Sequence, residues 1–113
     1  MKKLIVSSVL AFITFSAQAA AFQVTSNEIK TGEQLTTSHV FSGFGCEGGN
    51  TSPSLTWSGA PEGTKSFAVT VYDPDAPTGS GWWHWTVANI PATVTYLPTD
   101  AGRRDGTKLP TGA

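Results

Sequence analysis

The side chains best suited to chemistry lie between residues 73 and 84. Two carboxylates, Asp73 and Asp75, stand in the run Asp-Pro-Asp-Ala-Pro, and one imidazole, His84, follows after a stretch rich in glycine. An aspartate beside a histidine favours the charged imidazole and fixes which ring nitrogen carries the proton. Such a pair accepts a hydrogen bond from an ammonium or hydroxyl group and donates one to an anion. We therefore predict a polar ligand site built on Asp73 and His84.

Two strands must bring this pair together. Residues 66–72 are rich in β-branched and aromatic side chains, as is the segment from about 82 to 90, and turn residues separate them. We assume that these strands pair antiparallel, in a register that places Asp73 opposite His84. In that register the carboxylate and the imidazole meet at one end of a sheet, under a loop stiffened by proline.

Three tryptophans, Trp82, Trp83 and Trp85, surround His84 in the sequence. Because side chains alternate along a strand, we predict that Trp83 and Trp85 share one face and that Trp82 and His84 share the other. Large rings are more often core residues than ligand platforms. The tryptophan cluster therefore has two interpretations, one as packing and one as an exposed platform for a carbohydrate or protein partner.

Other chemistry has less support from the residues. Asp73, Asp75 and His84 imitate the ligands of a metal-assisted hydrolase, but no ligand-spacing motif accompanies them. The sequence has no Gly-x-Ser-x-Gly nucleophile motif. The two aspartates also suit a turn in which the side chain bonds the backbone two residues on. We expect a binding protein with no catalytic residue, metal or cofactor, and the metal-assisted hydrolase is the alternative.

The overall composition excludes several classes of protein. The chain has 113 residues, 7 Lys+Arg and 8 Asp+Glu, with a formal net charge of −1. This length predicts one domain, and this charge argues against a nucleic-acid partner. The single cysteine, Cys46, excludes a zinc finger and an internal disulfide within this sequence.

The N-terminal residues have the layout of a secretory signal peptide. Lys2 and Lys3 precede an apolar run over residues 4–15, and small residues follow it up to Ala21. The apolar run is shorter than the ~20 residues that a membrane-spanning helix needs. We therefore assign residues 1–21 to a cleaved leader, with no stable membrane insertion after cleavage, and predict a periplasmic location.

Cys46 needs an explanation in that oxidising compartment, where an unpaired cysteine is unusual. Three interpretations stay open at this point. The thiol is free, it pairs with another chain as in a homodimer, or its partner lies outside this sequence.

The remaining residues, 22–113, show short strands between turns. The sequence contains 12 glycines and 7 prolines, and no segment after the leader has a helical hydrophobic period. The predicted class is all-β, mainly antiparallel and sandwich-like. A glycine-rich loop is expected at 42–50. The predicted strands cover residues 22–25, 38–41, 55–57, 66–72, 82–90 and 93–97.

Four runs of the sequence point to one protein family when they are taken together. They are Asn-Thr-Ser-Pro-Ser-Leu-Thr-Trp at 50–57, Tyr-Asp-Pro-Asp-Ala-Pro at 72–77, Trp-Trp-His-Trp at 82–85 and Asn-Ile-Pro at 89–91. In these runs the chain resembles the phosphatidylethanolamine-binding protein family, and most closely its bacterial branch of Raf-kinase-inhibitor-like proteins. The resemblance covers nearly all of residues 22–113.

The resemblance implies a β-sandwich-like fold with a small anion-binding pocket at one end. It assigns Asp73 and His84 to the lining of that pocket, and Asp75 and Trp82 to positions at or beside it. The expected ligand is a small anionic or zwitterionic molecule, such as a phosphate or a phospholipid head group.

The chain also departs from the family pattern at its C-terminal end. Family members have a further segment that supplies the other wall of the pocket and more core strands, and in this branch it carries a cysteine suited to pair with Cys46. We therefore expect residues 22–113 to be the N-terminal part of such a domain. On this interpretation the fold is incomplete at the C-terminus and the pocket is partly present.

Overall fold

The computed structural model describes residues 20–113, so the predicted leader lies outside the described residues except for Ala20 and Ala21. Within these residues every regular element is a β-strand apart from one short 3-10 helix, η1 (Thr37–His39). All the strand pairs are antiparallel. The predicted all-β antiparallel class is confirmed. No helix within residues 20–113 is long and apolar enough to cross a membrane.

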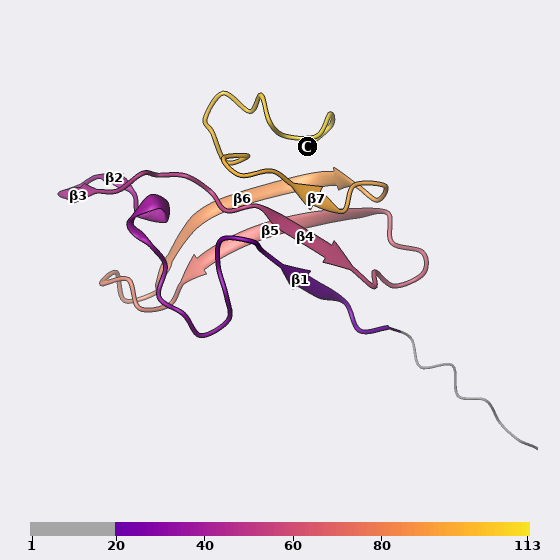
Figure 1. Cartoon of the computed structure of the whole chain (residues 1–113), viewed down its shortest axis with the longest axis horizontal. Helices are drawn as coiled ribbons and strands as arrows, with labels where there is room; N and C mark the ends of the chain where they lie inside the picture. The colour runs from indigo at the N-terminus through magenta and orange to yellow at the C-terminus, as the bar shows by residue number, and fades with distance from the viewer. Residues whose placement is uncertain (1–19) are drawn as a thin grey trace, which may run out of the picture.

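The strands form one small sheet, one hairpin and one long ribbon (Figure 1). The sheet has the order β1-β4-β7, the hairpin joins β2 to β3, and the ribbon joins β5 to β6. The strands are β1 (Gln23–Thr25), β2 (Ser42–Gly43), β3 (Cys46–Glu47), β4 (Leu55–Ser58), β5 (Ser66–Asp73), β6 (Trp82–Pro91) and β7 (Tyr96–Leu97).

The segment at 38–41 differs from its predicted strand. It begins as the 3-10 turn η1 and is held by the returning backbone at 48–51, where the amide of Asn50 donates to the carbonyl of Val40 at 2.9 Å. A Cβ on Gly48 would lie 2.0 Å from the oxygen of Val40, so only glycine permits this approach. The predicted loop at 42–50 contains the β2–β3 hairpin.

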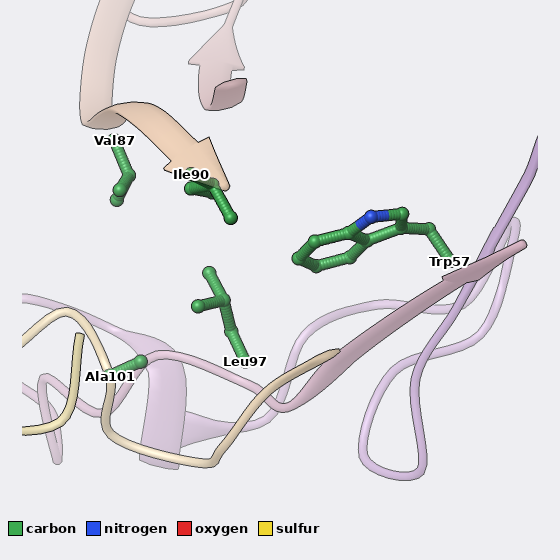
Figure 2. Packing of buried hydrophobic residues seen from close by; sticks show 5 residues of the cluster. All are labelled: Trp57, Val87, Ile90, Leu97 and Ala101. Carbon is green, nitrogen blue, oxygen red and sulfur yellow. The ribbon is translucent and has the colours of Figure 1, made fainter. Parts of the chain in front are cut away.

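The core lies where the sheet meets the second half of the ribbon. Figure 2 shows Val87 and Ile90 pointing from β6 toward Leu97 of β7 and Trp57 of β4, and Ala101 completes the group. Ile90 and Leu97 are fully buried. Burial of an aliphatic side chain of this size contributes ~1.5–3 kcal/mol, so this small cluster is the main apolar support of the fold.

A bulge in β6 allows Val87 and Ile90 to share the core face. Val87 pairs with Val69 and Ile90 pairs with Phe67, so β6 has an extra residue over this interval. Asn89 adopts a left-handed conformation there, with φ of 57°. Strict alternation would have sent one of the two aliphatic side chains to solvent.

An open apolar groove of about 380 Å³ runs between the sheet and the ribbon. Its walls come from β1, β4, β5 and β6, and they include Val24, Leu55, Val69 and Trp85. Two layers with apolar side chains between them make a sandwich-like arrangement.

Candidate functional site

The predicted pair, Asp73 and His84, meets at the end of the ribbon farthest from the core. Nε2 of His84 lies 3.6 Å from Oδ2 of Asp73, and the two side chains are 48% and 43% exposed. This distance suits an ion pair and is longer than a hydrogen bond. Exposed ion pairs contribute only ~0–1 kcal/mol to stability. The fold therefore gains little from this pair, and both groups face solvent where a ligand can reach them.

The register that was predicted for the two strands is wrong, although the contact is present. Asp73 pairs with Trp82, and Val71 pairs with Trp85, so His84 is the extra residue of a second bulge. A bulge leaves its extra residue out of the ladder and re-aims its side chain. The strand partner of Asp73 is thus Trp82, two residues before the predicted partner His84. The bulge nevertheless turns the imidazole of His84 toward the carboxylate.

The same bulge overturns the predicted arrangement of the tryptophans. Trp83 pairs with Tyr72, and their rings lie 4.6 Å apart on one face of the ribbon. Trp85 pairs with Val71 and packs against the core, on the opposite face. Because the extra residue at His84 reverses the alternation, Trp83 and Trp85 do not share a face. Trp82 and Trp83 are exposed, whereas Trp85 is half-buried.

Asp73 also has the turn-forming role that was proposed for it. Its Oδ1 accepts a hydrogen bond from the backbone amide of Asp75 at 2.9 Å. The turn and the ion pair thus use different oxygens of one carboxylate. In residues 20–113 no three His, Cys, Asp or Glu side chains converge as metal ligands, so Asp73, Asp75 and His84 do not form the three-ligand arrangement of the alternative hydrolase.

A second carboxylate, which the sequence analysis missed, organises the opposite part of the fold. Glu28 accepts hydrogen bonds from the amide and the hydroxyl of Ser54, at 2.7 and 2.5 Å, and from the hydroxyl of Thr99. The side-chain bond from Ser54, followed by that from Thr99, lowers the pKa of Glu28 to about 2. These partners are 26 and 71 positions away, so no local spacing indicated them.

The comparison with protein families decides where the chain belongs. Residues 25–113 match the family described as "Phosphatidylethanolamine-binding protein". The chain belongs to the phosphatidylethanolamine-binding protein family. The predicted resemblance is thereby confirmed, and the predicted site residues, Asp73, Asp75, Trp82 and His84, all lie within the matched range. Their roles in this chain stay predictions.

Relatives within this family include two proteins of Escherichia coli K12. The chain is 96% identical over 113 residues to "UPF0098 protein YbcL", covering all of this chain and 62% of that protein. It is 57% identical over 77 residues to "UPF0098 protein YbhB", covering 68% of this chain and 49% of that protein. The predicted bacterial branch is also confirmed.

A solved structure supports the fold as well as the family. It is titled "Crystal structure of E. coli YbcL, a new member of the mammalian PEBP family", where PEBP abbreviates the family name. The similarity has a TM-score of 0.80 at 96% identity, and it covers 82% of this chain and 57% of that one. This chain thus spans about three fifths of the length of YbcL.

Proposed function

We propose that this chain is a non-enzymatic binding protein for a small anionic or zwitterionic ligand, such as phosphate or a phospholipid head group. Membership of the phosphatidylethanolamine-binding protein family supports a ligand of this kind. The observation that carries the proposal is the exposed pair of Asp73 and His84 within the family-matched residues.

The geometry of the pair suggests a role for each group. Nε2 of His84 faces the carboxylate of Asp73, so Nδ1 on the other side of the ring is the nitrogen left for the ligand, and its N–H donates to an anionic oxygen. The carboxylate of Asp73 is an acceptor for an ammonium group of the ligand. Trp82, the strand partner of Asp73, places an exposed indole beside the pair. Asp75 adds a further carboxylate in the adjoining turn.

Titration calorimetry with inorganic phosphate and with phosphoethanolamine tests this proposal. We expect His84→Gln to weaken both ligands about 10-fold or more, because a hydrogen bond to a charged group contributes ~1.5–3 kcal/mol. The matched control is His39→Gln, which changes the other histidine, whose Nδ1 contacts the carbonyl oxygen of Thr51 away from the pair. Equal affinities of the wild type and His84→Gln would reject the assignment.

The proposal also places the mature protein in the periplasm, after removal of residues 1–21. Fractionation of expressing cells and the intact mass of the periplasmic product test this location. We expect a product whose N-terminus begins close to residue 22. Recovery of full-length chain in the cytoplasmic fraction would contradict it.

The exposure of Trp82 and Trp83 favours a second candidate, an interaction module for carbohydrate or protein partners. Its test is a change in tryptophan fluorescence on addition of oligosaccharides, compared between the wild type and Trp83→Leu. Identical spectra with and without oligosaccharide would remove the carbohydrate form of this candidate.

A further inference from the structure

The loop at 74–81, which joins Asp73 to the start of β6, is fixed at both ends by neighbouring residues of β5. At its start, Oδ1 of Asp73 accepts from the amide of Asp75. At its end, the hydroxyl of Tyr72 donates to the carbonyl oxygen of Ser80 at 2.7 Å. Successive strand residues face opposite sides of a sheet, so the loop is held from both faces of the ribbon.

Tyr72 has close neighbours that define where its hydroxyl lies. Its ring packs on Trp83 with 4.6 Å between centroids and a 40° tilt. A Cβ on Gly81 would lie 2.3 Å from the tyrosine oxygen and 2.7 Å from the backbone oxygen of Asp73. Gly81 also has φ of 72°, a conformation that favours glycine. The backbone at Gly81, just before β6, therefore packs directly against the hydroxyl of Tyr72.

We propose that Tyr72 is a positioning residue for the ligand site on the other face of the ribbon. By holding Ser80 and Gly81, the hydroxyl fixes the point at which β6 begins. That point sets the pairing of Asp73 with Trp82, and with it the bulge that carries His84 to the carboxylate. The effect on ligand affinity rests on the proposed function, whereas the effect on geometry does not.

The substitution Tyr72→Phe removes the hydroxyl and keeps the ring that packs on Trp83. Its matched control is Tyr96→Phe, which changes the other tyrosine, an exposed residue of β7. We expect Tyr72→Phe to raise the Kd for inorganic phosphate about 2- to 10-fold, as the loss of one hydrogen bond allows, and Tyr96→Phe to leave it unchanged. A lower urea midpoint with unchanged phosphate affinity would show a merely structural role and overturn the proposal.

A second readout needs no ligand. Nuclear magnetic resonance follows the exchange of the Asp75 amide, which bonds Asp73, and the ring signals of His84. We expect faster exchange and shifted ring signals in Tyr72→Phe but not in Tyr96→Phe. If the wild type binds no phosphate, the proposed function fails, and this measurement still decides the positioning role. Unchanged exchange and unchanged ring signals in Tyr72→Phe would overturn it.

Discussion

Two substitutions at Asp73 separate the functions of its two carboxylate oxygens. Asp73→Asn keeps an oxygen that accepts from the Asp75 amide, because asparagine forms this turn as well as aspartate does, but it removes the charge that faces His84. Asp73→Ala removes both interactions. The turn hydrogen bond contributes ~0.5–1.5 kcal/mol. The ion pair contributes less than about 1 kcal/mol, because its side chains are 48% and 43% exposed.

These magnitudes predict different outcomes for stability and for binding. We expect Asp73→Asn to change the free energy of unfolding by less than about 0.5 kcal/mol, and Asp73→Ala to lower it by about 1 kcal/mol. We expect both variants to weaken phosphoethanolamine binding about 10-fold, because each loses the charged oxygen. Urea unfolding followed by tryptophan fluorescence measures the first effect, and titration calorimetry measures the second.

The control for these variants is Glu62→Gln, which removes an exposed carboxylate from the turn between β4 and β5. It should alter neither quantity. Equal destabilisation by Asp73→Asn and Asp73→Ala would refute the division between the two oxygens. Retained affinity in Asp73→Asn, with lost affinity in Asp73→Ala, would show that the site needs the turn and not the charge.

Three further predictions concern the rest of the fold. Ile90→Ala should lower the free energy of unfolding by about 2–5 kcal/mol, because Ile90 is fully buried, and a loss below ~1 kcal/mol in urea titration would contradict the assigned core. Glu28 has a folded pKa of about 2 against an ordinary value of 4.5, so it stabilises the fold above about pH 4.5 and loses that contribution as the pH falls toward 2. Glu28→Gln should therefore flatten the pH dependence of the urea midpoint in this range, and an unchanged slope would reject the assigned role. Cys46 is exposed and free, so it should react with a thiol reagent in the native protein and give a disulfide-linked dimer on oxidation, whereas chains that stay monomeric on a non-reducing gel would contradict this.

The sequence was most informative where its pattern was local. The composition of 66–72 and 82–90 correctly predicted the two long strands, which the structure places at Ser66–Asp73 and Trp82–Pro91. The meeting of Asp73 and His84 was also predicted, although from the wrong register. Periodicity alone could not locate the bulges, because they depend on which side chains the rest of the fold buries.

Sequence patterns could not predict interactions between segments that are distant in the chain. Glu28 lies in a polar stretch and bonds Ser26 locally, but nothing in that local contact indicates that it joins Ser54 to Thr99. The segment at 38–41 has the composition of a strand. It turns instead because the glycines at 48 and 49 let the returning backbone bond it directly. In both cases, tertiary contacts determined the local structure.

Strand β6 carries the proposed site residues and the core residues in separate halves. Its first half carries Trp82 and His84, and its second half carries the buried Val87 and Ile90. Ile90 follows His84 by six positions, which corresponds to at most ~20 Å along the strand. Effects of substitutions this far apart are usually additive. Substitutions at the end with the proposed ligand site can therefore change ligand preference during evolution while the core end maintains the stability of the fold.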